Sequence, residues 1–207
     1  MSWFAGGSIG YLTELEEPMY NLHVGITDSC WKVAGCNVSF FLEVGYTQTD
    51  ESYQYNDGDY SGRWDEDGQS FTIDELGQYL QGQANWHGDH DDGPAHPETY
   101  DLQIIPITLN IKFDRALTGN LNAYLGAGMG MANVSLDIND HDIGDVSEDD
   151  WVFTAQIFGG LSYSFTPAFE VYGGARWIYY QSADLGGNNT LELEDDCLLE
   201  LGARYKF

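Results

Sequence analysis

Hydrophobic and polar residues alternate along much of this 207-residue chain. The final stretch, CLLELGARYKF, carries apolar residues at every second position: Leu199, Leu201, Ala203, Tyr205 and Phe207. A period of two is typical of a β-strand. Because chain ends usually fray, a regular strand that reaches the last residue is expected to pair within a sheet.

The same alternation predicts eight strands, over residues 2–12, 19–27, 37–49, 99–113, 119–136, 151–165, 168–182 and 191–207. Where both faces can be read, one is apolar and free of charge, as in Ile105, Ile107, Leu109, Ile111 and Phe113. The 25 glycines, 14 tyrosines and 14% aromatic residues also favour strands over helices. The sequence therefore predicts an all-β domain over residues 1–207.

Two architectures fit these strands, and they place the apolar face on opposite sides. A soluble sandwich or lipocalin-like barrel turns it inward, whereas a membrane barrel turns it to lipid. The second face is mostly Gly, Ser, Thr and Asn, which suits a crowded lumen better than a water-exposed surface. Aromatic residues also gather at the two ends of the apolar faces, as at bilayer interfaces. We therefore expect an eight-stranded antiparallel up-and-down transmembrane β-barrel.

The connections between the predicted strands are unequal. Three turns on the side of the termini are short, whereas the opposite side carries residues 13–18, 50–98, 137–150 and 183–190. These segments and their strand tips hold 29 of the 34 acidic residues and, of the seven basic ones, only Arg63. The pattern predicts long acidic extracellular loops, above all loop 2 (50–98), with both termini in the periplasm.

Net charge and hydropathy exclude two other classes of protein, nucleic-acid binders and helical membrane proteins. A net charge of −27 excludes a nucleic-acid binder, and no run of 18 apolar residues could form a transmembrane helix. The first residues, SWFAGGSIGYL, form a strand pattern and lack the basic start of a signal peptide. We interpret the chain as the mature form of an exported protein with an added Met1.

The chain resembles the small eight-stranded OmpA/OmpX-like outer-membrane barrels. The resemblance rests on IIPITLNIKF, LNAYLGAGMGMA, GGLSYSFTPAFEVYGGARW and the terminal ELGARYKF. It implies a place in the outer membrane of a Gram-negative cell envelope, among lipid and lipopolysaccharide. It also implies that Tyr205 and Phe207 form the signal that the barrel-assembly machinery reads.

Charged residues fall on the faces that the barrel would turn inward. They are the basic residues Lys112, Arg176, Arg204 and Lys206 and the acidic residues Glu43, Glu170 and Glu200. An eight-stranded barrel is just wide enough for side chains to fill, and buried charges must pair. We expect a salt-bridged, filled lumen; the alternative is a narrow gated ion path. His23 should form hydrogen bonds in the lumen.

Loop 2 holds the candidate metal ligands. In DGDYSGRWDEDG, the residues Asp57, Asp59, Ser61 and Asp65 match positions 1, 3, 5 and 9 of an EF-hand loop, but Gly68 replaces the glutamate at position 12. The alternatives are a looser calcium site or a solvated acidic loop. His87 and His90, with Asp89 or Asp92, have the ligand types of a transition-metal site, against the same solvated-loop alternative.

Cys30 and Cys36 flank a short turn, and an oxidising compartment would permit a Cys30–Cys36 disulfide; the alternative is two free thiols. Cys197 should face outward and stay unpaired. No serine in a recognisable nucleophile context accompanies the histidines, so we expect no enzyme.

Two functions are compatible with these features. The first is a structural and surface-interaction barrel, whose acidic loops attract cations and meet either an extracellular protein partner or the lipopolysaccharide layer. The second is a transport barrel, either porin-like for ions or OmpW-like for apolar small molecules. The charged, filled lumen favours the first.

Overall fold

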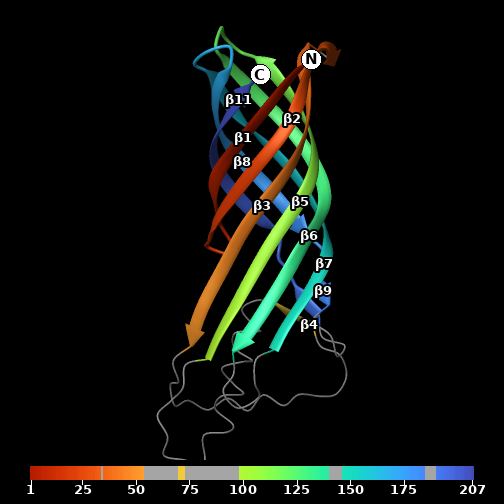
Figure 1. The fold of residues 1–207 in the computed structure, drawn as a ribbon, viewed down its shortest axis with the longest axis vertical. Helices are drawn as coiled ribbons and strands as arrows, with labels where there is room; N and C mark the ends of the chain where they lie inside the picture. Colours follow the sequence, from red (N-terminus) through yellow and green to blue (C-terminus); the bar gives the residue numbers. More distant parts are fainter. Residues whose placement is uncertain (34, 54–69, 73–97, 140–145, 185–189) are drawn as a thin grey trace, which may run out of the picture.

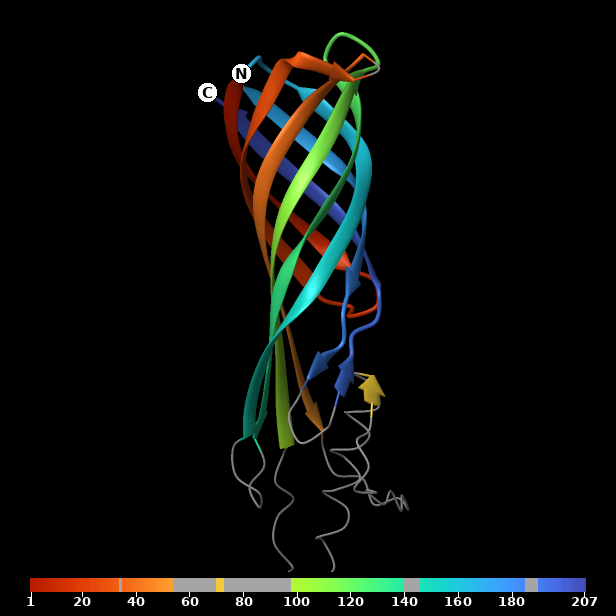
Figure 2. The ribbon, with the colours of Figure 1, turned by 90° about the vertical axis from the view of Figure 1, so that its right-hand side faces the viewer.

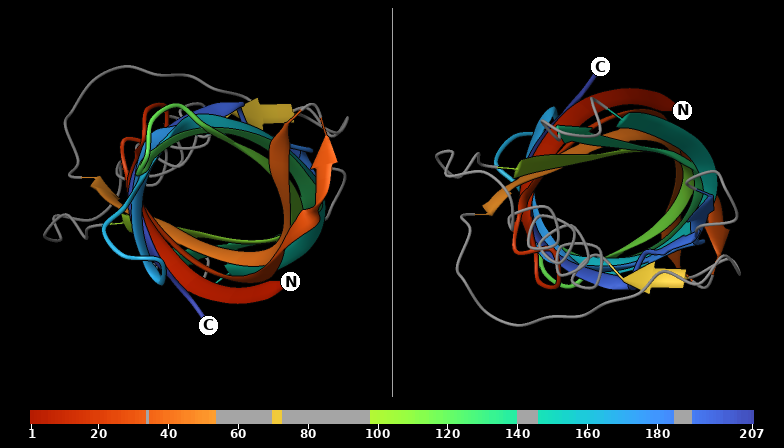
Figure 3. Two further views of the ribbon diagram at one scale, coloured as in Figure 1. Left: turned by 90° about the horizontal axis from the view of Figure 1, so that it is seen from above. Right: turned by 90° about the horizontal axis from the view of Figure 1, so that it is seen from below.

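The computed structural model describes residues 1–33, 35–53, 70–72, 98–139, 146–184 and 190–207. Eight strands close into one antiparallel barrel in the order β1-β11-β8-β7-β6-β5-β3-β2 (Figures 1 and 3). Their bounds are β1 (Ser2–Leu12), β2 (Pro18–Val33), β3 (Cys36–Tyr53), β5 (Glu98–Ala116), β6 (Leu121–Asn139), β7 (Val146–Ser164), β8 (Phe169–Tyr180) and β11 (Asp196–Lys206). This order confirms the predicted up-and-down barrel.

The first and last strands form the seam of the barrel. β1 and β11 pair from Phe4 opposite Lys206 to Leu12 opposite Leu198. Beyond them, the Trp3 N–H donates to the Phe207 carbonyl oxygen (3.1 Å) and the Phe207 N–H donates back (2.9 Å). The last residue is thus tied into the sheet, and both termini lie at one end (Figure 1). We call this the terminal end and the opposite one the far end.

Some strand boundaries differ from the prediction. β2 continues to Val33 through an irregularity between Asp28 and Lys32, so the turn before β3 is tighter than expected. Residues 190–192 do not belong to the last barrel strand. They form β10 (Thr190–Glu192), which pairs in parallel with β4 (Ser70–Thr72) and antiparallel with β9 (Ala183–Asp184) in a second, three-stranded sheet. In the described part of the chain, no helix is long and apolar enough to cross a membrane.

The outer surface of the barrel carries a continuous apolar band. Exposed aliphatic residues occupy its middle, among them Leu22, Leu109, Leu125 and Leu201. Exposed aromatic rings border the band at both ends: Trp3, Tyr163, Phe165, Phe169, Tyr205 and Phe207 at the terminal end, and Tyr11, Tyr20, Tyr46, Trp151, Phe153, Trp177 and Tyr179 at the far end. Two aromatic borders around an apolar band are the pattern of a lipid-facing barrel surface.

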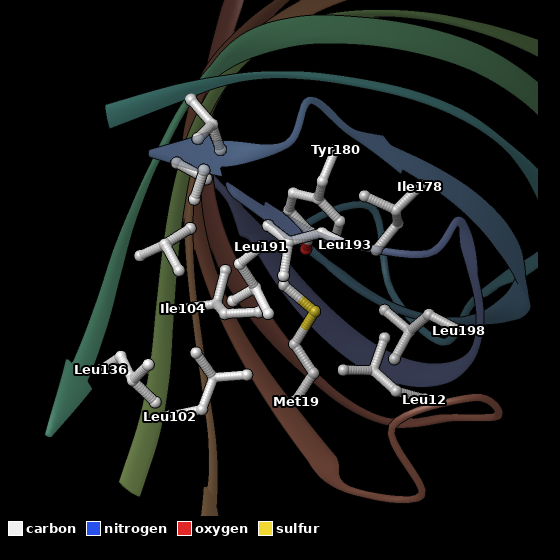
Figure 4. Packing of buried hydrophobic residues seen from close by; sticks show 14 residues of the cluster. Leu12, Met19, Leu102, Ile104, Leu136, Ile178, Tyr180, Leu191, Leu193 and Leu198 are labelled. Atoms are coloured by element: carbon white, nitrogen blue, oxygen red, sulfur yellow. The ribbon is translucent and has the colours of Figure 1, made fainter. Parts of the chain in front are cut away.

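The far half of the lumen is apolar, which corrects the expectation of a small polar inner face. Strands β3, β5, β6 and β7 extend past their neighbours at the far end (Figure 2). Inward-facing residues of β5, β6 and β7, together with Met19 of β2, pack against the second sheet and the ends of β1, β8 and β11 (Figure 4). We call this cluster the mouth core: Leu12, Met19, Leu102, Ile104, Ala132, Val134, Leu136, Val152, Ile178, Tyr180, Ala183, Leu191, Leu193 and Leu198.

A buried carboxylate fixes the first far-end turn to the mouth core. Asp196 is 2% exposed, and its carboxylate accepts hydrogen bonds from the backbone N–H groups of Thr13 (2.8 Å), Glu14 (3.0 Å) and Leu15 (3.1 Å). The turn between β1 and β2 is therefore held against the start of β11.

The barrel lumen as the candidate functional site

Inward-facing glycines make room for large side chains in the lumen. A Cβ on Gly160 or Gly174 would lie 2.7 or 2.6 Å from the Tyr124 hydroxyl, and one on Gly126 would collide with the Phe158 ring. Real Cβ atoms do not approach neighbours this closely, so only glycine fits at these positions. The glycine-rich inner face of the sequence is therefore filled by aromatic rings from other strands.

The middle of the lumen holds a group that we call the central cluster: Arg176, Glu43, Glu200 and Gln156. The Arg176 guanidinium forms ion pairs with Glu43 and with Glu200, the latter at 3.0 Å from Nη2 to Oε2. It also donates to Gln156 Oε1 (3.0 Å). All four side chains are buried. One guanidinium therefore bridges carboxylates that β3 and β11 bring from opposite parts of the sequence.

Neutral groups complete the hydrogen bonds of the central cluster. Gln156 Nε2 donates to Glu43 Oε1 (3.2 Å) and to Asn110 Oδ1 (2.6 Å). Ser8 Oγ donates to Glu200 Oε2 (3.0 Å). Because buried charges are tolerated only when they are paired and hydrogen-bonded, these partners are needed to hold two carboxylates at one guanidinium.

A second group, the terminal cluster, lies nearer the terminal end: Lys112, Asp114, Glu170, Arg204 and Lys206. Asp114 Oδ1 is 3.0 Å from Lys112 Nζ and 3.4 Å from Arg204 Nη2. Glu170 pairs with Arg204 and, at 2.7 Å, with Lys206 Nζ. Lys206 is the most exposed member, with 28% of its side chain exposed. The cluster therefore alternates cations and carboxylates towards the terminal end.

The two clusters balance each other in charge. The central cluster carries one cation and two carboxylates, whereas the terminal cluster carries three cations and two carboxylates. Together they are neutral at pH 7. Aromatic rings lie against the cations of both clusters, with the Arg176 guanidinium 5.3 Å from the centre of the Phe158 ring and the Arg204 guanidinium 5.3 Å from that of Phe4.

All seven charged residues that the sequence placed in the lumen lie there, in the two clusters. Sequence reasoning missed Asp114, because the predicted strand ended at residue 113 although the alternation continues for one more inward position. It placed Gln156 correctly on the inward face of its strand, but it did not predict that this residue takes part in the central cluster. His23 faces inward, but its Nδ1 has no hydrogen-bond partner among the described residues and lies 3.9 Å from Glu43 Oε2.

Other predicted sites lie outside the described residues. The calcium ligands Asp57, Asp59, Ser61 and Asp65 and the histidines His87 and His90 belong to this group. The side chain of Cys30 is likewise not described, so its pairing with Cys36 is not tested, whereas the outward-facing Cys197 carries a free thiol. The Cys30–Cys36 bridge therefore stays a prediction, which counting free thiols under denaturing, non-reducing conditions would test.

The family of the chain follows from its second half. Residues 76–207 match the model of the outer membrane protein beta-barrel domain. The chain belongs to this family. Its members' barrels span the bacterial outer membrane, so the apolar band is the lipid-facing surface and the two clusters lie within the membrane-spanning part. No curated protein sequence matches the chain.

Solved barrels show the same fold at low sequence identity. Neisserial surface protein A, NspA, is 13% identical, with a TM-score of 0.56 and coverage of 100% of this chain and 96% of that chain. A major outer membrane protein from Thermus thermophilus is 12% identical, with a TM-score of 0.61 and coverage of 100% and 99%. The N-terminal β-barrel domain of Pseudomonas aeruginosa OprF is 14% identical, with a TM-score of 0.50 and coverage of 100% and 97%.

Proposed function

We propose that this outer-membrane barrel is a non-conducting scaffold that presents an acidic surface to cations and to an extracellular protein partner. The observation that carries the proposal is the filling of the lumen at two levels. The mouth core occupies the far half, and the two charge clusters with the aromatic rings packed against them occupy the rest. A conducting pore needs a continuous aqueous path, which packed apolar side chains would interrupt.

The charge distribution supports the acidic-surface part of the proposal. Outside the apolar band, the far end carries exposed acidic residues, among them Glu148, Asp149, Asp184 and Glu194. Accumulated like charge raises the local concentration of cations and favours basic partners. Both effects act on the outside of the cell if the termini lie in the periplasm, as we propose.

The bilayer experiment tests the scaffold against the transport alternative. Purified protein in planar lipid bilayers should produce no steady single-channel steps, because apolar packing at the mouth core and paired charges nearer the terminal end leave no aqueous path. An established porin inserted into the same bilayers serves as the positive control for detecting single-channel steps. Steady open steps from the unmodified protein would contradict the scaffold and favour the porin-like function.

Calcium is the cation that we propose for the acidic loops. The acids of loop 2 repel one another unless cations compensate them, and weak, roughly millimolar binding suits an extracellular module. Calorimetric titration of calcium should give saturable heat that an Asp57→Ala/Asp59→Ala variant reduces. Identical titrations of the two proteins would remove this loop as a site.

The terminal end fits the proposed route of assembly. Tyr205 and Phe207 are exposed on the last strand, at the seam where β1 and β11 close the barrel. We propose that the barrel-assembly machinery reads these two rings from the periplasmic side. Replacing Phe207 by Ala should then slow insertion into the outer membrane while the isolated protein still folds in detergent.

A further inference from the structure

A small cavity lies between the central and terminal clusters. Its volume is about 30 Å³, and residues of all eight barrel strands line it. The lining includes Glu43 and Arg176 of the central cluster and Lys112 and Arg204 of the terminal cluster. Since about 10–15 Å³ of such volume suffices for one water molecule, the cavity has room for about two.

Some of the polar atoms that line this cavity have no hydrogen-bond partner among the described residues. Four buried atoms of its walls make no hydrogen bond within the described part of the protein: His23 Nδ1, Tyr124 Oη, Arg176 Nε and Arg204 Nε. The two arginine Nε–H groups are donors only. A buried donor without an acceptor costs the full free energy of its desolvation. Several such groups around one cavity indicate that something in it accepts their hydrogen bonds.

Two occupants could accept these hydrogen bonds, a halide ion or water, and the charge of the lining decides between them. A halide ion would accept from both arginines, but Glu43 and Glu200 also line the cavity and would repel it. The eight charges of the two clusters already sum to zero, so an added anion would leave the lumen with an uncompensated charge. Water accepts from the arginines and donates to the carboxylates, and it changes no charge.

We propose that this cavity is a hydration site that holds about two water molecules and joins the two clusters into one hydrogen-bonded unit. The waters accept from Arg176 Nε on one side and from Arg204 Nε on the other. They also bond the Tyr124 hydroxyl and His23 Nδ1. The negative central cluster and the positive terminal cluster are thereby linked, although no ion pair among the described residues connects them directly.

Removal of the Tyr124 hydroxyl tests the site, because a hydrated and a dry cavity predict opposite changes in the stability of the barrel. Tyr124→Phe keeps the ring, and with it the contact of Lys112 Nζ at 5.3 Å from the ring centre. If water bonds the hydroxyl, the folded-to-unfolded ratio should fall about fivefold in urea unfolding of the barrel in lipid vesicles. If the cavity is dry, removal of an unpaired buried hydroxyl should raise that ratio instead.

Tyr180→Phe is the matched control. The Tyr180 hydroxyl is also buried without a partner among the described residues, but its ring belongs to the apolar mouth core and does not line the cavity. Its removal should leave the ratio unchanged or raise it. A Tyr124→Phe protein as stable as the unmodified one, or more stable, would overturn the proposal.

A crystal structure of the unmodified protein gives a second, direct measurement. It should show water density within hydrogen-bond distance of both arginine Nε atoms, and crystals soaked in bromide should show no anomalous peak in the cavity. A bromide peak there would identify an anion site and overturn the assignment of water. Density for neither would show that the cavity is dry, which also contradicts the proposal.

Discussion

Replacement of Arg176 by Met should lower the free energy of unfolding by about 3–5 kcal/mol, because it leaves Glu43 and Glu200 buried without a cation. Both carboxylates are less than 5% exposed, and Arg176 pairs with each of them. Met keeps most of the aliphatic volume, so the loss reports charge rather than a cavity. Urea unfolding of the barrel in lipid vesicles, followed by tryptophan fluorescence, would measure it.

Two further variants separate the buried ion pairs from a general effect of charge. Arg115→Met removes an exposed cation near the terminal end and should cost less than about 0.5 kcal/mol. Neutralising the orphaned carboxylates, in Glu43→Gln/Arg176→Met/Glu200→Gln, should recover much of the lost stability. The destabilisation of Arg176→Met should also shrink at acidic pH, since protonation removes the unpaired charges. A triple variant no more stable than Arg176→Met would refute this account.

Gly160→Ala should destabilise the barrel by about 2–3 kcal/mol, because there is no space for a methyl group on the inner face at this position. Its Cβ would collide with the Gly173 carbonyl oxygen and lie 2.7 Å from the Tyr124 hydroxyl. The collision with backbone matters most, since backbone atoms of a paired strand cannot move aside. Thermal unfolding in detergent would measure the loss.

The neighbouring glycine provides the control on the same strand. A Cβ on Gly159 would point outward and lie 3.3 Å from the Tyr124 carbonyl oxygen and 3.4 Å from Leu125 Cδ1, so it needs a shift of only a few tenths of an ångström. Gly159→Ala should therefore be neutral or stabilise by about 0.5–1 kcal/mol, through the lower backbone entropy of the unfolded chain. Equal losses for the two variants would show that loss of glycine itself, and not the lumen contact, is responsible.

Alternation along the chain was sufficient to predict the barrel, because a period of two determines which side chains face lipid and which face the lumen. It assigned Glu43, Arg176 and Glu200 to the inner face correctly, since each lies within a regular strand. It could not identify partners, because the contact between Arg176 and Glu43 depends on the stagger of strands that are not neighbours in the barrel. Register across a closed barrel is not encoded in any one strand.

The apolar mouth core could not be predicted for a related reason. The mouth core includes Leu102, Val134 and Val152, which continue the inward face of strands that are polar nearer the terminal end. The alternation shows that these side chains face inward, but it does not show which residues they pack against. Leu191 was assigned to the last barrel strand, whereas it belongs to β10 and packs over the lumen. Pairing between β4 and β10 joins segments that are far apart in the chain, and no local sequence pattern predicts such a contact.

The parallel pairing of β4 with β10 has a consequence for the order of folding. β4 precedes β5 in the chain and β10 follows β8, so four of the eight barrel strands, β5 to β8, lie between the two segments that pair. Contacts between such distant segments form slowly, because the intervening chain must first be ordered. The β5 to β8 part of the barrel wall, whose pairing brings β4 and β10 to the same end, should therefore form while the far opening is still uncovered. Water displaced from the lumen as it fills can then leave on that side before the second sheet covers it.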